Sequence, residues 1–114
     1  MEFETVRQGD ILRINVLAER IDAACAIQFK DRMRELCGTE PARVVLDLQQ
    51  VDFLDSSGLG AVVAAMKLLG KDRRLELAGL SSKVSKVFRL TRMDSVFTIH
   101  NSADAAMNSN ASAA

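Results

Sequence analysis

The sequence predicts a single α/β domain with a mixed sheet of roughly four to five strands and about four helices, mainly on one face. The chain has 114 residues, 48% of them hydrophobic, which suffices for one core and leaves no room for a second comparable domain. Period-two alternation near the N-terminus gives way to stretches of helical period. The central strands are apolar on both faces, as is typical of parallel strands covered by helices.

The first elements are predicted to form an antiparallel hairpin. Residues 3–6 and 11–17 are the strands, and Gln8, Gly9 and Asp10 form the turn. The second strand alternates at period two, with Leu12, Ile14 and Val16 on one side and Arg13 and Asn15 on the other.

A helix is predicted next, from Asp22 to Cys37, with Asp22 as the N-cap and Gly38 at the C-cap. Its apolar stripe consists of Cys25, Phe29, Met33 and Leu36. The two cysteines stand twelve residues apart on this helix, about 18 Å, whereas a disulfide needs Cα atoms within about 7 Å. We therefore expect two reduced thiols.

The middle of the chain predicts a βαβ unit with a right-handed crossover. Its strands are residues 44–48 and 75–78, and its helix runs from Ser57 to Gly70. Ser81 and Ser82 open a further helix whose inner face carries Val84, Val87, Phe88 and Thr91. Residues 96–99 are the last strand, and a short helix follows at residues 103–107. We expect the domain to cover residues 1–108 and a flexible tail residues 109–114.

Charge and hydropathy exclude several classes of function. Fifteen basic residues balance fifteen acidic ones, so the chain has no electrostatic footprint for nucleic acid or an anionic membrane. No apolar stretch approaches the roughly 18 to 20 residues that span a bilayer. The N-terminus is acidic where an export signal is basic. We expect a cytoplasmic protein without membrane insertion.

Catalytic and cofactor sites are also not predicted. The single histidine, His100, is expected at the surface, and no second base lies at a recognisable spacing from Ser56 or Ser57. One histidine and two distant cysteines do not build a zinc site. Gly58 and Gly60 begin a dinucleotide-binding pattern, but Val63 occupies its third glycine position. We expect a protein that is not an enzyme and has no metal or cofactor.

The DSSG segment (residues 55–58) lies where a strand leads into a helix. The first turn of a helix has backbone N–H groups without intrahelical acceptors, so Asp55 or Ser56 is expected to cap it. Capping needs one short polar residue, whereas three precede the glycine here. The additional hydroxyls point to an open surface that the active site of another protein can reach.

The helix that follows this segment is apolar on two sides. Its core face is expected to consist of Leu59, Val62, Val63, Met66 and Leu69. A second apolar side contains Ala61, Ala64, Ala65 and Leu68. Such a helix is either buried on both sides or covered by a partner on its outer face.

Residues 44–48 and 51–60 (VVLDL and VDFLDSSGLG) resemble the central signature of STAS-domain anti-sigma factor antagonists. The likeness extends over nearly the whole chain and includes Ile21 and Asp22 and the segment 82–97. In that family the serine directly after the aspartate is phosphorylated, which corresponds to Ser56. The fold that the resemblance implies, a mixed sheet with helices mainly on one side, agrees with the element order above.

The resemblance also implies partners. The unphosphorylated protein is expected to bind an anti-sigma factor that is also a serine kinase, which then releases its sigma factor. A metal-dependent serine/threonine phosphatase would restore the active form. The family's acidic residue near the kinase contact corresponds to Asp22. The partner surface is expected to include Asp22, Asp55, Ser57, Gly58, Leu59, Ala61, Ala64, Ala65 and Leu68.

STAS domains also occur in stressosome scaffolds and as accessory subunits of lipid transporters. The alternative function is therefore a constitutive scaffold or transporter subunit in which Ser56 is only a helix cap. In either case we expect a monomer or a weak homodimer.

Overall fold

The first two strands form the predicted hairpin. In the computed structural model, which describes residues 1–109, β1 (Glu2–Gln8) and β2 (Ile11–Leu17) pair antiparallel. Gly9 in their turn has φ of 59°, a left-handed conformation that favours glycine. The inward side chains of β2 are those that the period-two alternation predicts, since Leu12, Ile14 and Val16 are buried.

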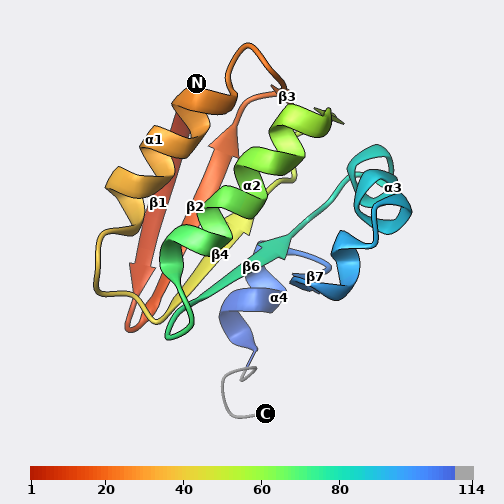
Figure 1. Cartoon of the computed structure of the whole chain (residues 1–114). Helices are drawn as coiled ribbons and strands as arrows, with labels where there is room; N and C mark the ends of the chain where they lie inside the picture. The colour runs from red at the N-terminus through yellow and green to blue at the C-terminus, as the bar shows by residue number, and fades with distance from the viewer. Residues whose placement is uncertain (110–114) are drawn as a thin grey trace.

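Three more strands extend this hairpin into a five-stranded mixed sheet, which confirms the predicted fold class (Figure 1). They are β4 (Arg43–Asp47), β6 (Arg74–Ala78) and β7 (Thr98–His100). The order is β1-β2-β4-β6-β7, and all neighbours from β2 onward are parallel. Two short strands that the sequence did not predict, β3 (Arg20–Ile21) and β5 (Phe53–Leu54), pair with each other.

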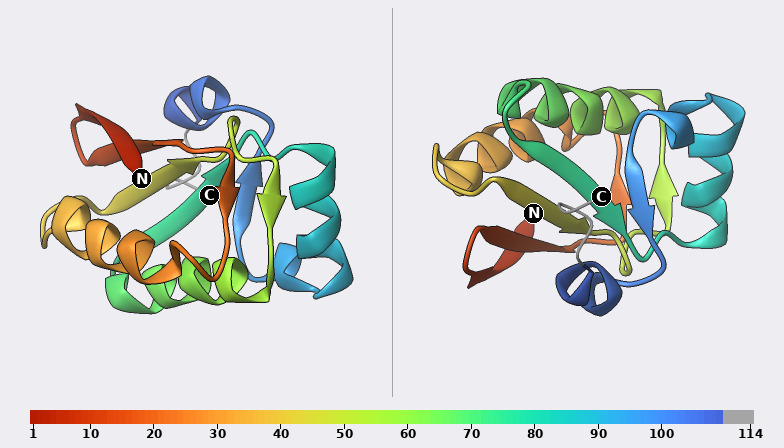
Figure 2. Two further views of the ribbon diagram at one scale, coloured as in Figure 1. Left: turned by 90° about the horizontal axis from the view of Figure 1, so that it is seen from above. Right: turned by 90° about the horizontal axis from the view of Figure 1, so that it is seen from below.

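The helices are distributed unevenly about this sheet. α1 (Ala26–Cys37) and α2 (Ser56–Leu69) lie side by side over one face, and the main core, including Phe29, Met33 and Leu46, lies between them and the sheet. α4 (Ala103–Asn108) covers part of the opposite face, and α3 (Ser82–Leu90) lies beyond the sheet near β5 (Figure 2).

The structure differs from the prediction at the start of α1, at the last strand and at Thr91. α1 begins at Ala26, four residues after the predicted cap. The predicted last strand at residues 96–99 is shifted, because a 3-10 helix, η1 (Met93–Ser95), precedes it and β7 begins at Thr98. Thr91, predicted on the inner face of α3, is exposed, and its hydroxyl donates to the Val87 carbonyl oxygen at 2.7 Å. Of the predicted tail, residues 110–114 lie outside the described residues.

No helix within residues 1–109 combines the length and the apolar character needed to cross a bilayer.

Candidate functional site

Asp55 joins the start of α2 to the turn before α1. It is the N-cap of α2, and its Oδ1 accepts a hydrogen bond from the Gly58 N–H at 2.8 Å. Its other oxygen, Oδ2, accepts from the Ala23 N–H at 3.2 Å. One carboxylate therefore fixes two segments that are distant in sequence.

Asp22 organises the turn on the α1 side of this junction. Its Oδ1 accepts from the Ala24 N–H at 3.1 Å, and its carbonyl oxygen accepts from the Cys25 N–H at 3.1 Å. The prediction that Asp22 caps the helix is therefore wrong, because these bonds close a turn first. The bond from the Ala23 N–H to the Asp55 carboxylate brings this turn to the start of α2.

Gly58 is the point of closest approach between α2 and β3. A Cβ atom at this position would lie 1.9 Å from the carbonyl oxygen of Ile21, so only glycine fits. Gly58 is buried, and a partner does not reach it. Its place in the predicted partner surface is wrong, since the glycine serves packing within the domain.

Both serines of the DSSG segment are exposed. Asp55 supplies the helix cap, so the choice that the sequence left between Asp55 and Ser56 is settled in favour of Asp55. Within the part of the chain that the structure describes, the hydroxyls of Ser56 and Ser57 form no hydrogen bond. The fold therefore does not use these two hydroxyls.

The buried face of α2 differs from the one expected from the sequence, since it consists of Gly58, Ala61, Val62, Ala65 and Leu69. Ala61 and Ala65 are 2% and 3% exposed, so their assignment to the partner surface is wrong. The reason is that Ala61 and Ala65 share a stripe of the helix with Val62 and Leu69, and this stripe packs into the main core under α1 and α2 (Figure 1). Ala64 is half-buried and Leu68 is 40% exposed, and these two remain on the outer side. On the predicted core side, Leu59, Val63 and Met66 are only half-buried.

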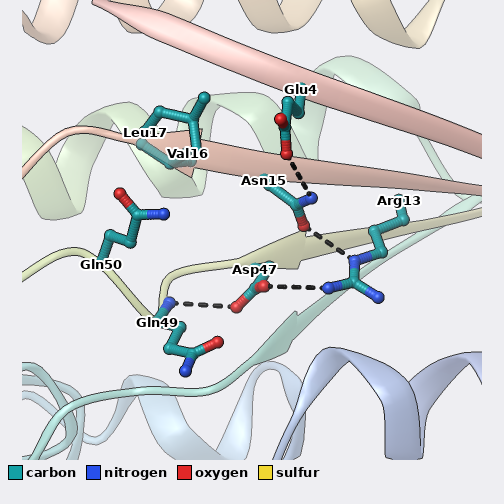
Figure 3. A pocket seen from close by; sticks show the side chains of 8 residues that line it. All are labelled: Glu4, Arg13, Asn15, Val16, Leu17, Asp47, Gln49 and Gln50. Atoms are coloured by element: carbon teal, nitrogen blue, oxygen red, sulfur yellow. Dashed lines mark hydrogen bonds and ion pairs between the residues drawn. The ribbon is translucent and has the colours of Figure 1, made fainter.

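A polar pocket of about 210 Å³ lies elsewhere, on the face of the sheet opposite α1 and α2 (Figure 3). Glu4, Asn15 and Asp47 stand opposite one another on β1, β2 and β4. The Asn15 amide donates to Glu4 at 3.3 Å, and Arg13 donates to Asn15 at 2.8 Å and pairs with Asp47 at 3.5 Å. These groups satisfy one another, so the pocket is a structural network of the sheet.

His100 belongs to a buried charge cluster that the sequence analysis missed. It is half-buried rather than at the surface, and its Nε2 lies 2.7 Å from Oε1 of Glu76. Arg43 donates to both oxygens of Glu76 at 2.7 Å. The available signal was Glu76 itself, a carboxylate in the middle of the apolar strand at residues 75–78, where burial requires a cationic partner.

Neither a metal site nor a disulfide is present within residues 1–109: no three His, Cys, Asp or Glu side chains gather there, and both cysteines are free. Burial raises the pKa of the Cys37 thiol, and the charge of Arg73 opposes this effect only in part. The raised pKa favours the protonated thiol.

Comparison with known proteins agrees with this architecture. The sequence model of the STAS domain matches residues 2–106. The anti-sigma-B factor antagonist of Listeria monocytogenes is 31% identical over 107 residues, covering 92% of this chain and 93% of the relative.

Two solved structures share the fold. An anti-sigma factor antagonist from Mycobacterium paratuberculosis has a TM-score of 0.83 at 23% identity, covering 93% of this chain and 90% of that one. The Bacillus cell fate determinant SpoIIAA in its phosphorylated form has a TM-score of 0.69 at 18% identity, covering 94% and 97%. The domain match and the relative's identity over nearly the full length show that this chain belongs to the STAS domain family, among the anti-sigma factor antagonists.

Proposed function

We propose that this protein binds an anti-sigma factor that is also a serine kinase, and that phosphorylation of Ser56 switches the binding off. The observation that carries the proposal is that Ser56 is exposed at the first residue of α2 while Asp55 alone caps the helix. The Ser56 hydroxyl therefore makes no contact that the fold requires. The Listeria relative named as an anti-sigma-B factor antagonist, and the similar SpoIIAA with its phosphorylated form, support the same assignment.

The helix that follows Ser56 tolerates a phosphate. A phosphoserine adds about 1.5 to 2 negative charges at neutral pH. At the N-terminus of a helix these charges face the positive end of the macrodipole and N–H groups without intrahelical acceptors. Phosphorylation is therefore expected to leave the fold intact and to change only the surface.

The charge change is large enough to abolish binding. Asp55 already places a carboxylate directly before the serine. The Ala23–Asp55 bond brings the turn that contains Asp22 next to it, where the Asp22 carboxylate pairs with Arg20 at 3.6 Å. If a carboxylate of the partner lies about 6 Å from a doubly charged phosphate, the repulsion is on the order of 5 kcal/mol at an effective dielectric constant near 20. That corresponds to about three to four decades in affinity.

The surface that we propose for the partner is smaller than the one expected from sequence. It retains the exposed or half-buried members, namely Asp22, Asp55, Ser57, Leu59, Ala64 and Leu68, and it excludes the three buried ones. A serine/threonine phosphatase restores the active form. The protein acts in the cytoplasm, where sigma factors work, as a monomer or weak homodimer without catalytic activity, a cofactor or nucleic-acid binding.

Incubation with the anti-sigma factor kinase of the same organism and ATP, followed by mass-spectrometric mapping, tests the phosphorylation site. We expect phosphate on Ser56 of the wild type, the same result in the matched control Ser57→Ala, and no incorporation in Ser56→Ala. Modification of Ser57 alone would contradict the assignment.

Binding measurements separate a switch from a constitutive scaffold. Ser56→Asp is expected to weaken binding of the kinase, whereas Ser56→Ala retains it. Equal affinities of the two variants, with copurification in an assembly that phosphatase treatment leaves unchanged, would favour the scaffold or transporter subunit.

A further inference from the structure

α4 makes few apolar contacts for an element that covers a sheet face. Its buried side chains are Ala103 and Ala106, which pack on Val45 and Ala78 together with the half-buried Met107. Alanine removes little apolar surface from water, and a helix of six residues is not stable by itself. Other contacts must hold α4 in place.

Arg43 on β4 holds the C-terminal end of α4. Its Nη2 donates to the Ala106 carbonyl oxygen at 3.2 Å, and its Nη1 donates to that of Ser109 at 3.4 Å. The Ala106 carbonyl oxygen also accepts from the Ser109 N–H at 3.2 Å, so the guanidinium adds to a bond that the C-cap already makes. The same guanidinium makes two bonds of 2.7 Å to Glu76, and its side chain is only 6% exposed. Glu76 thus fixes the arginine in the position from which it reaches α4.

A second arginine, Arg13 on β2, holds the N-terminal end. Its Nη1 lies 2.9 Å from Oδ1 of Asp104 in the first turn of α4. Figure 3 shows the same guanidinium fixed from the other side by Asn15 and Asp47. Both ends of α4 are therefore bound by cationic side chains that the sheet itself positions.

We propose that α4 acts as a latch: it leaves the sheet and returns to it as one unit while the rest of the domain stays folded. Arg43 is the side chain that holds it closed. The cluster lies beside the connection to α4, because His100, which contacts Glu76 at 2.7 Å, ends β7 three residues before α4 begins. Opening the latch uncovers Val45, Ala78 and the charged cluster on the back of the sheet.

Hydrogen exchange of the full chain, followed residue by residue by NMR, tests the latch. The informative variant is Arg43→Met combined with Glu76→Met, which removes both partners of the buried ion pair together. Only His100 and the exposed Arg74 then lose a contact to Glu76. We expect amides 106–109 to exchange at least about tenfold faster than in the wild type, as loss of charge-assisted bonds implies. The amides of β4 and β6 should keep their protection. Unchanged exchange in α4, or acceleration shared equally by β4 and β6, would overturn the proposal.

A surface variant keeps the test decisive if the double variant does not fold. Asp104→Asn removes the ion pair with Arg13 at a side chain that is 85% exposed, so the fold is not at risk. We expect exchange in α4 to accelerate about twofold to fivefold, as for a weak exposed pair, and the matched control Asp94→Asn in η1 to leave it unchanged. Equal exchange rates in Asp104→Asn and the wild type would contradict the role of Arg13.

Discussion

The Asp55 carboxylate accepts a hydrogen bond from the backbone N–H of Ala23 at 3.2 Å, across 32 residues of sequence. Through this bond the turn before α1 and the start of α2 form one continuous surface next to Ser56. The proposed phosphorylation site and the acidic Asp22 are held together by the same carboxylate that caps the helix.

Replacing Asp55 tests this junction. We expect Asp55→Ala to lower the free energy of unfolding by about 1–2 kcal/mol, because α2 loses its cap and Ala23 loses its acceptor. Asp55→Asn is the matched control, since its single amide oxygen can still cap α2 and the loss should be smaller. Urea denaturation of both variants measures the difference. An Asp55→Ala variant as stable as the wild type would contradict the junction.

Gly58 and Gly60 form a matched pair in the same helix. A Cβ at Gly58 would collide with the Ile21 carbonyl oxygen, whereas a Cβ at the exposed Gly60 meets nothing within 4 Å. We expect Gly58→Ala to destabilise the domain by more than about 2 kcal/mol, and Gly60→Ala to stabilise it by up to about 1 kcal/mol. Thermal unfolding distinguishes them, and effects of equal sign would be inconsistent with the packing of α2 on β3.

Leu68 lies on the outer face of α2, and its neighbour Leu69 lies on the core face. Leu68 is 40% exposed and Leu69 is 5% exposed. We expect Leu69→Ala to cost about 2–5 kcal/mol of stability and Leu68→Ala to cost less than about 1 kcal/mol. If the partner docks on this face, Leu68→Ala weakens binding while the fold is retained. Titration calorimetry with the anti-sigma factor measures this, and wild-type affinity would remove Leu68 from the proposed surface.

The lowered pKa of Glu76 predicts how the stability of the fold depends on pH. Burial raises its pKa, but the hydrogen bonds from Arg43 and His100 and the charges of Arg43 and Arg74 outweigh this effect and lower the pKa below its ordinary value. The folded state therefore binds fewer protons than the unfolded state. The stabilisation is complete above the ordinary carboxyl pKa of about 4.3 and is lost as the pH falls through the lower folded-state value.

The variant with Arg43→Met and Glu76→Met provides the comparison for this effect. We expect the wild type to lose stability more steeply than this variant when the pH falls below about 4.3. Urea denaturation at a series of pH values measures both slopes. Parallel pH profiles would show that Glu76 does not contribute.

The fold class could be predicted because strong periodicity spans most elements. β2 has the bounds that the alternation of Leu12, Ile14 and Val16 indicates, and the core of α1 contains the predicted Phe29 and Met33. The strands β3 and β5 were missed because two residues are too few to show a period. The start of α1 was misplaced because an aspartate closes a turn with the same kind of bond that caps a helix.

The candidate site was predicted only in part, because tertiary contacts decide which of its residues are buried. The DSSG segment marks the start of α2, but the burial of Ala61 and Ala65 depends on which face of α2 turns toward the core, which is a tertiary property. Likewise, the cluster around Glu76 joins residues from β4, β6 and β7, whose register no single stretch of sequence contains.

In the proposed switch, the charge of a phosphate on Ser56 controls binding. The most direct test measures the affinity of the anti-sigma factor kinase for the unphosphorylated protein and for the protein phosphorylated at Ser56, at the same ionic strength. We expect phosphorylation to weaken binding by about three decades while the circular dichroism spectrum stays the same. Equal affinity of the two forms would contradict the switch.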